Sequence, residues 1–349
     1  MSPVSPEPAS FKLSICISTF NRAALIGATL ESIITQATDE CEIVVLDGAS
    51  TDDTERVVSE WVAAFDRLRY VRQDTNNGVD RDFDRAVELA RGEFCWLLPD
   101  DDLLKPGAVA AVLEALRRSY SLVVVNTEDK DANMANVLQQ SRLGFSSDRV
   151  YGPGEMDRLF AEAGAHLSYT GSVVIDRAIW LARARVCYYG SMFIHVGVIF
   201  QAPLPGETLV MAKPYISYRH SSAHAWWPKL FEIFMFRWPA LVWSLAPSES
   251  AKRKVCSAEP WREFRTLLQF RAFGVYSLAE YWRWIHPRVH SIWETMIPTV
   301  VALLPGVLVN ALYVFYCSVV RGRDQPLMLQ WMKESRFYLW NWLGLKREL

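Results

Sequence analysis

The chain has 349 residues, of which 51% are hydrophobic and 22% are charged. This composition excludes a disordered or collagen-like chain, and the length is sufficient for one large domain or two smaller ones. The charge is uneven, because residues 1–218 carry 20 Lys and Arg against 30 Asp and Glu, whereas residues 219–349 carry 17 against 9. Eleven of the 14 Trp residues lie from Trp226 onward. This asymmetry predicts two parts with different roles, and the net charge of −2 gives no indication of nucleic-acid binding.

Neither the start of the chain nor its cysteines indicate export. The first ten residues, MSPVSPEPAS, have no basic or apolar region of the kind found in a signal peptide. We therefore expect residues 1–11 to be a flexible leader and the protein to be cytoplasmic. The six cysteines are scattered and form no C-x-x-C pair, which predicts neither a zinc site nor a set of disulfides.

Residues 12–126 alternate short apolar runs with segments of helical periodicity. The apolar runs predict strands over 13–18, 42–47, 68–72, 93–98 and 121–126. The segments between them predict helices over 23–37, 52–65, 80–91 and 105–118. Because the predicted strands are apolar along nearly their whole length, we expect an α/β fold in which helices cover both faces of a parallel sheet.

The rest of the chain is organised differently. Residues 127–165 show no regular pattern. Residues 166–220 predict strands over 171–175, 208–212 and 215–219, with helices near 177–185 and 192–201. From Trp226 onward the pattern is helical, aromatic and basic, so we expect a separate helical region over 226–349.

Polar side chains collect where the predicted strands end. STFNR follows the first strand, DGASTDD the second and PDDD the fourth. Ligands of open α/β sheets bind at the carboxyl ends of the strands, and carboxylates there suit a Mg²⁺ or Mn²⁺ ion that bridges to phosphates. The chain has neither G-x-G-x-x-G after the first strand nor G-x-x-x-x-G-K-[ST], which disfavours a dinucleotide-binding dehydrogenase and a P-loop enzyme. We interpret Asp52 and Asp53 as helix-capping residues.

Four motifs carry a family resemblance. In this order and spacing, STFNR, VVLDGASTDDT, NNGVDRDFDRA and GEFCWLLPDDD resemble the family-2 glycosyltransferases of the GT-A fold. The chain is most similar to the abequosyltransferase-like branch that acts on O-antigen lipid intermediates, over roughly residues 11–225. The resemblance implies a mixed, mainly parallel sheet flanked by helices. Residues 12–126 would form the nucleotide-sugar-binding half, and residues 127–225 the acceptor-side half of the catalytic domain.

The resemblance also implies roles for individual residues in these motifs and in YRHSS at 218–222. The residues that would bind the nucleotide sugar are Thr19, Asn21, Arg22, Asp47, Arg81, Asp100, Asp101 and Arg219. Asp102 would hold a Mn²⁺ or Mg²⁺ ion, and His220 could join it as a second ligand. The family usually has two carboxylates after the second strand, in Asp-Asp-Gly-Ser, but this chain has Gly48 at the second position. The contact with the nucleotide base is therefore expected to differ.

Inverting glycosyl transfer needs a general base, and the family commonly supplies it from a Glu-Asp pair on a helix. The matching segment here, YGSMFIHV at 189–196, has no carboxylate, so His195 is its one candidate. Neutral imidazole is a competent base near pH 7. A structural histidine on an apolar helix is the alternative interpretation.

The second half contains a long uncharged segment. Residues 295–320 have 26 residues without a charge, 19 of them apolar, with Trp and basic residues on either side. This composition is typical of a membrane interface. Pro298, Pro305 and Gly306 interrupt the segment, so we expect a peripheral or re-entrant association, or a broken helix, at the cytoplasmic face of the inner membrane. A helical subdomain that packs on protein is the alternative.

The sequence thus predicts an enzyme that moves one sugar from a nucleotide-sugar donor to a saccharide on a polyprenyl-diphosphate carrier, with inversion and with a divalent metal. The Q-x-x-R-W element and multiple spanning helices of processive synthases are missing, which favours a single addition. A sugar nucleotidylyltransferase is an alternative, but STFNRAALIG is not the Gly-rich basic loop that it would need. A non-catalytic nucleotide-sugar-binding scaffold is a second alternative.

Overall fold

The computed structural model describes residues 11–220, 226–320 and 326–339, which form two compact units. The first unit contains residues 11–128, 140–219 and 245–251. The second contains 129–139, 220, 226–244, 252–320 and 326–339. The predicted flexible leader lies outside the described residues, apart from Phe11.

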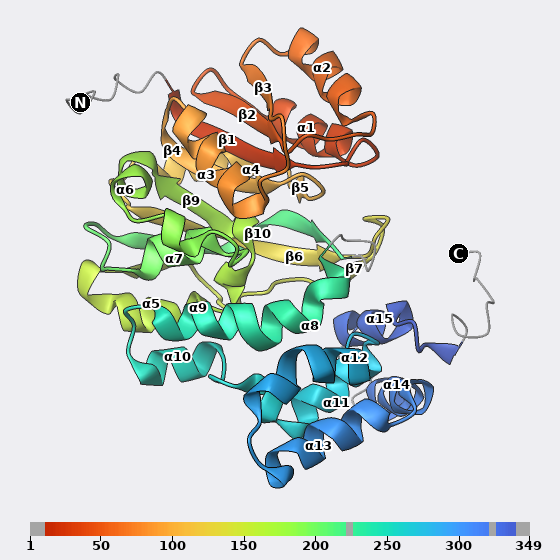
Figure 1. The fold of residues 1–349 in the computed structure, drawn as a ribbon. Coiled ribbons are helices and arrows are strands. Elements are labelled where there is room, and N and C mark those ends of the chain that lie inside the picture. Colours follow the sequence, from red (N-terminus) through yellow and green to blue (C-terminus); the bar gives the residue numbers. More distant parts are fainter. Residues whose placement is uncertain (1–10, 221–225, 321–325, 340–349) are drawn as a thin grey trace. The chain divides into compact units, whose positions relative to one another are not determined.

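The first unit is built on a sheet with the strand order β3-β2-β1-β4-β9-β6-β10-β5 (Figure 1). Four strands run parallel at one end, and Ile15 of the central strand lies opposite Ile43 and Trp96. They are β1 (Phe11–Thr19), β2 (Cys41–Asp47), β3 (Leu68–Arg72) and β4 (Gly92–Pro99). β9 (Val173–Asp176) is antiparallel to β4 and to β6 (Leu122–Lys130). The predicted mixed, mainly parallel sheet is confirmed.

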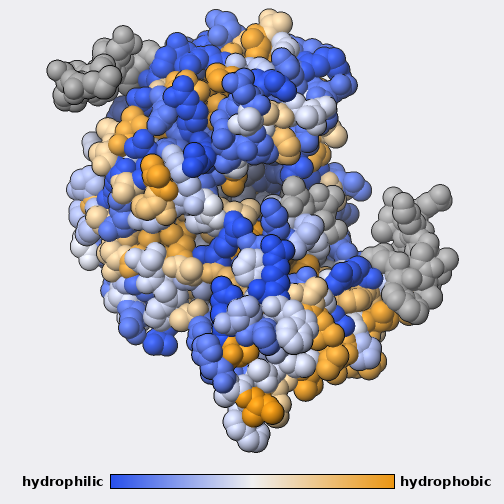
Figure 2. Space-filling view, in the orientation of Figure 1, coloured by the Kyte–Doolittle hydropathy of each residue, from blue (hydrophilic) through white to orange (hydrophobic). Residues whose placement is uncertain are grey.

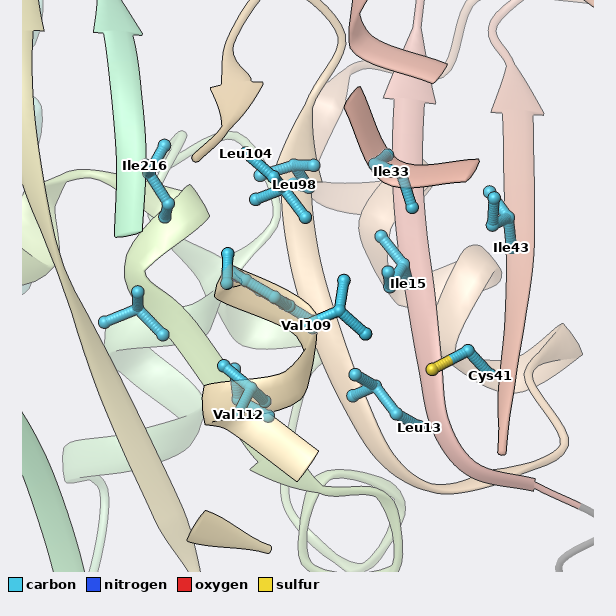
Figure 3. Packing of buried hydrophobic residues seen from close by; sticks show 14 of the residues in the cluster. Leu13, Ile15, Ile33, Cys41, Ile43, Leu98, Leu104, Val109, Val112 and Ile216 are labelled. Carbon is cyan, nitrogen blue, oxygen red and sulfur yellow. The ribbon is translucent and has the colours of Figure 1, made fainter. Parts of the chain in front are cut away.

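Helices pack on the parallel strands through alternate apolar side chains. Leu13 and Ile15 share a buried cluster with residues of α1 (Ile26–Ile34), α2 (Thr54–Ala64) and α4 (Ala108–Ala115) (Figure 3). α3 (Val79–Leu89) contacts β1 and β2. Burial of a large aliphatic side chain contributes about 1.5–3 kcal/mol, so this core fixes the strand ends that carry the polar motifs.

Two strands that the sequence predicted separately, over 208–212 and 215–219, form a single strand. β10 runs unbroken over Thr208–Arg219 through Pro214, where the sequence predicted a break. Its first residues pair with β8 (Arg149–Tyr151), and its last with β5 (Leu103–Leu104). Pro214 lies between the residues that pair with β8 and those that pair with β5, where neither partner is in register with it. The prediction of two strands was wrong.

The segments around β10 include elements that the sequence did not predict, namely β5, β8 and α5 (Met156–Ala163). α6 (Arg177–Ala182) and α7 (Ile194–Phe200) lie where helices were expected. In the second unit, β7 (Val137–Gln139) pairs with the last residues of β6.

The second unit is otherwise helical, as predicted, with an aromatic core. Phe231 stacks on Tyr276 with ring centres 4.7 Å apart. The α-helices described here, other than α13 and α14, are α8 (Leu230–Glu232), α9 (Trp238–Ser244), α10 (Glu249–Val255, which begins in the first unit), α11 (Phe264–Ala272), α12 (Leu278–Glu280) and α15 (Pro326–Glu334).

α13 (Ile292–Leu303) and α14 (Gly306–Phe315) form an elbow in the uncharged segment. Arg271 closes the elbow, because its Nε and Nη2 donate to the Leu304 carbonyl at 3.0 and 2.7 Å. Asn310 is fully buried in α14, and its Nδ2 donates to the carbonyls of Ala272 and Met332. These bonds satisfy polar groups inside an apolar region.

Candidate active site

The loops after β1 and β2 are locked together by hydrogen bonds. Asn21 adopts a left-handed backbone with φ of 54°, its N–H donates to Ser50 Oγ at 2.8 Å, and its Oδ1 accepts from the Thr51 N–H at 2.7 Å. Thr19 ends β1, is buried, and its carbonyl accepts from the Gly48 N–H at 2.9 Å. The two strand ends therefore form one rigid edge.

Asp47 forms hydrogen bonds inside this edge of the sheet. Its Oδ1 accepts from the Ser50 N–H at 2.7 Å, and its Oδ2 accepts from the Tyr70 hydroxyl at 2.5 Å. Burial and the Asp47 carboxylate raise the pKa of Tyr70, so the tyrosine stays a neutral donor. Asp47 is fully buried, and both of its oxygens serve bonds within the chain.

The acidic run lies at the end of β4, beside Arg22. The Arg22 Nε is 3.4 Å from Asp100 Oδ1, and its Nη2 is 3.8 Å from Asp101 Oδ2. Burial, together with the charge of Asp101, raises the pKa of Asp100 to about 7. Arg22 therefore lies between the first two carboxylates of the run.

Asp102 is positioned by the pairing of β5 with β10. Because Leu103 lies opposite Ser217, Arg219 is carried to the acidic run. The Arg219 N–H donates to Asp102 Oδ1 at 2.7 Å, and its Nε donates to the Asp101 carbonyl at 2.9 Å. Thus the sheet brings together two motifs that are 117 residues apart in the chain.

Tyr169 completes the surroundings of Asp102 and was not predicted from the sequence. Its hydroxyl donates to Asp102 Oδ2 at 2.6 Å, and burial beside this carboxylate raises the Tyr169 pKa. The Arg142 guanidinium lies 4.1 Å from the ring centre of Tyr218 and 5.3 Å from that of Tyr169. Arg142 lies in the segment 127–165, which has no regular pattern, and Tyr169 precedes the strand predicted over 171–175, so no sequence motif pointed to either residue.

His195 is enclosed in the core of the first unit. It is 1% exposed, its Nε2 lies 2.8 Å from the Leu167 carbonyl, and its Nδ1 lies 3.4 Å from Thr170 Oγ1. A carbonyl partner requires Nε2 to carry the proton, and burial lowers the pKa of His195 to about 4. This geometry favours the structural role that the sequence left as an alternative.

Two further predicted residues, Arg81 and His220, contact aromatic rings. The Arg81 guanidinium lies 4.8 Å from the ring centre of Tyr189, on the exposed side of α3. His220 belongs to the second unit, where its N–H donates to the Lys130 carbonyl and its ring lies 4.8 Å from that of Trp331. Their roles in donor and metal binding stay predictions.

Residues 14–186 match the family described as Glycosyl transferase family 2. They form a family-2 glycosyltransferase domain. The chain is 27% identical over 205 residues to the abequosyltransferase RfbV of Salmonella typhimurium, an alignment that covers 55% of this chain and 62% of the relative. It is 33% identical over 126 residues to the GalNAc(5)-diNAcBac-PP-undecaprenol beta-1,3-glucosyltransferase of Campylobacter jejuni, with 36% and 41% covered. The predicted family is confirmed by the family match. The chain spans less than two thirds of the length of these two relatives.

Solved structures confirm the fold of this glycosyltransferase domain. The S. aureus TarS structure in complex with UDP superposes with a TM-score of 0.57 and 16% identity, and the match covers 94% of this chain and 91% of that one. A mannosyltransferase from Pyrobaculum calidifontis in complex with GDP-Man and Mn²⁺ gives a TM-score of 0.53 and 14% identity, with 99% and 91% covered. At these identities the likeness establishes the GT-A fold alone.

The glycosyltransferase domain has a donor set that fits a hard divalent cation. Asp100, Asp101 and Asp102 offer carboxylate oxygens, which Mg²⁺ and Mn²⁺ prefer. Within residues 11–220, 226–320 and 326–339, no three His, Cys, Asp or Glu side chains are gathered as a ready metal cluster. Phosphate oxygens of a donor and water would therefore complete the coordination.

Proposed function

We propose that this chain is a glycosyltransferase that transfers one sugar, with inversion, from a nucleotide-sugar donor to a saccharide on a polyprenyl-diphosphate carrier in surface polysaccharide or O-antigen synthesis. The observation that carries the proposal is the acidic run of a family-2 domain, held at the carboxyl edge of the sheet by Arg22, Tyr169 and Arg219. The names of the two relatives, an abequosyltransferase and a transferase acting on a PP-undecaprenol saccharide, support the acceptor class.

The departure of a nucleoside diphosphate needs positive charge where negative charge develops. A Mn²⁺ or Mg²⁺ ion held by Asp102 would supply this charge when bound, with Asp100 and Asp101 toward the donor. The Arg22 ion pairs orient the first two carboxylates, and the Arg219 N–H and Tyr169 hydroxyl orient the third. The base role of His195 toward the acceptor hydroxyl stays a prediction, which its enclosed position does not favour.

Turnover of sugar nucleotides by the purified protein tests the proposal. We expect release of nucleoside diphosphate from a UDP-, CDP- or GDP-sugar that stops with EDTA and returns with Mn²⁺. A nucleotidylyltransferase would instead form sugar nucleotide from sugar phosphate and nucleoside triphosphate, with release of pyrophosphate. A non-catalytic scaffold would bind the donor and release no diphosphate under any condition, and either result would refute the proposal.

We further propose that the elbow of α13 and α14 binds a membrane surface. No single described helix is long and apolar enough to cross a bilayer, whereas Ile292–Leu303 and Gly306–Val319 pass that test as a pair bent by 81°. One side of the pair packs inside the second unit through Val301, Ala302 and Val309. The other side is apolar and exposed (Figure 2), and includes Ile292, Trp293, Met296, Val300, Leu303, Leu308, Leu312 and Phe315.

This arrangement supports a peripheral association, in which the exposed side lies in the interface and the packed side stays in protein. The surplus of Lys and Arg over 219–349 favours anionic lipids. The cytoplasmic face of the inner membrane is the location that this proposal implies.

Removal of the exposed apolar side chains is expected to release the protein from lipid. The triple variant Trp293→Ser, Leu308→Ser, Phe315→Ser changes side chains that are 76%, 57% and 60% exposed, so its fold should be retained. We expect its partition onto phosphatidylglycerol-containing liposomes, measured by co-sedimentation, to fall more than about tenfold. Phe264→Ser, 48% exposed on α11, is the matched control and should pellet like wild type. Wild-type protein that ignores these liposomes would contradict the membrane proposal.

A further inference from the structure

Helix α3 carries three buried aspartates, which the donor-binding roles assigned above do not use. Two of them hold the segment that leads into α7. Asp80 accepts from the N–H groups of Met192 and Ile194 at 2.8 and 3.0 Å. Asp84 accepts from Trp180 Nε1 at 2.9 Å and pairs with Arg185. These contacts explain Asp80 and Asp84 as structural residues.

Asp82 has different neighbours, at the ends of the parallel strands. Its Oδ1 accepts from Gln73 Nε2 at 2.6 Å, and Gln73 directly follows β3. A Cβ built on Gly48 would lie 3.0 Å from Asp82 Oδ2, a distance shorter than ordinary contact. Since the Gly48 N–H is bonded to the Thr19 carbonyl, Asp82 reaches the joined edge of β1, β2 and β3.

Asp82 therefore lies against the side of Gly48 from which a side chain would project. The backbone at Gly48 is outside the left-handed region, so the constraint on a side chain there comes from Asp82, which would have to shift by a few tenths of an ångström. The carboxylate that the family resemblance implies at position 48 is absent, and the carboxylate of Asp82 lies against the position where its Cβ would stand. Each oxygen of Asp47 already accepts a bond within the chain, from Ser50 or from Tyr70.

We infer that Asp82 is a donor-recognition residue, whose carboxylate accepts a hydrogen bond from the nucleoside part of the sugar nucleotide in place of a side chain at Gly48. The inference rests on the proposed function, and ligands of α/β sheets bind at this edge. A carboxylate is an acceptor only, so the matching groups are N–H donors on the base or hydroxyls on the ribose.

The free-energy cost of burying the Asp82 carboxylate supports a role for this residue in ligand binding. Asp82 is 2% exposed, and burial, with the charges of Asp47 and Asp80 nearby, raises its pKa to about 6. A buried carboxylate close to two others destabilises a fold unless something compensates it, and its two side-chain partners, the Gln73 amide and the Ser18 hydroxyl, are neutral. A donor from the bound nucleoside provides further compensation.

Calorimetry with UDP, CDP and GDP, each with Mn²⁺, tests the inference on the full chain. Asp82→Asn keeps the shape and the bond from Gln73 but removes the charge. We expect it to weaken binding of the preferred nucleotide roughly 10- to 100-fold, the usual effect of losing a hydrogen bond to a charged group. Asp84→Asn, on the same helix, is the matched control, which should lower the thermal midpoint and leave nucleotide affinity unchanged.

A swap variant keeps the test independent of any folding defect in Asp82→Asn. The double variant Gly48→Asp, Asp82→Ser moves the carboxylate back to the usual family position. We expect its nucleotide affinity to lie within about threefold of wild type, because the two changes compensate each other in a double-mutant cycle. Gly48→Asp alone places two carboxylates close together and should bind nucleotide poorly.

The ranking of the three nucleotides identifies the group that Asp82 contacts. A changed ranking in Asp82→Asn would assign the contact to the base, and an equal loss of affinity for all three would assign it to the ribose.

The failures of the two proposals are distinguishable. If wild type binds none of the three nucleotides and turns over no sugar nucleotide, the proposed function fails and the role of Asp82 fails with it. If wild type binds and turns over its donor while Asp82→Asn binds equally well, the inference about Asp82 alone is overturned. A swap variant that binds as weakly as Asp82→Asn would overturn the equivalence of the two positions.

Discussion

Replacement of Asp102 by Asn is expected to lower sugar transfer by roughly 100- to 1000-fold, the usual effect of removing one charge-stabilising group from an active site. The substitution removes a negative charge from the acidic run. It also places an NH₂ group against either the Arg219 N–H or the Tyr169 hydroxyl, both of which need an acceptor. We expect Mn²⁺ affinity, measured by calorimetry, to fall together with the initial rate.

Two further variants separate charge from architecture at this position. Tyr169→Phe removes one hydrogen bond and no charge, so its loss of rate should be smaller than that of Asp102→Asn. Asp53→Asn changes an exposed carboxylate at the start of α2 and should behave like wild type. Wild-type-like Mn²⁺ affinity and rate in folded Asp102→Asn would remove Asp102 from the proposed site.

His195→Ala is expected to cost stability rather than turnover. The variant removes a buried ring that joins α7 to the turn at 166–172, which should lower the free energy of unfolding by about 2–4 kcal/mol. The folded fraction should keep nearly normal turnover, because both ring nitrogens face the chain itself. A loss of roughly 10²- to 10⁴-fold in turnover, with a wild-type thermal midpoint, would instead establish His195 as the general base.

The pH dependence of unfolding gives an independent readout of the same histidine. The pKa of His195 is about 4 in the folded chain and 6.5 for an ordinary histidine, so the unfolded chain binds the extra proton between these values. Stability from this residue is fully present above pH 6.5 and is lost as the pH falls toward 4. We expect it to contribute about 2 kcal/mol to the loss of stability between pH 7.5 and pH 5. Urea unfolding should show this component in wild type and not in His195→Ala, and equal pH slopes would contradict the assignment.

The sequence predicted the parts of this fold that depend on local periodicity. The apolar runs from 13–18 to 121–126 became strands because a buried parallel strand is apolar along its length, a property visible in a single segment. Pro214 misled the prediction for β10, since the effect of a proline in a strand depends on which neighbour pairs there, and the neighbours are distant in the chain.

The sequence likewise predicted some features of the candidate site and missed others. Motif spacing placed the acidic run and the loops after β1 and β2 at one edge of the sheet, as the structure has them. It did not predict Tyr169 beside Asp102 or Asp82 beside Gly48, because a periodic pattern specifies which face a residue takes and not which distant residue it meets. Arg81 and His195 illustrate the converse: both lie in or near family motifs, yet tertiary packing directs one to Tyr189 and the other into the core.

Hydrogen bonds hold the elbow in the second unit in its bent form. To straighten α13 and α14 into one continuous rod, the Leu304 carbonyl would have to leave the guanidinium of Arg271. That carbonyl would then be left unsatisfied in apolar surroundings, at a cost of about 1–3 kcal/mol. Asn310 separately ties α14 to the carbonyls of Ala272 and Met332. The chain's own hydrogen bonds therefore favour the bent arrangement of the two arms.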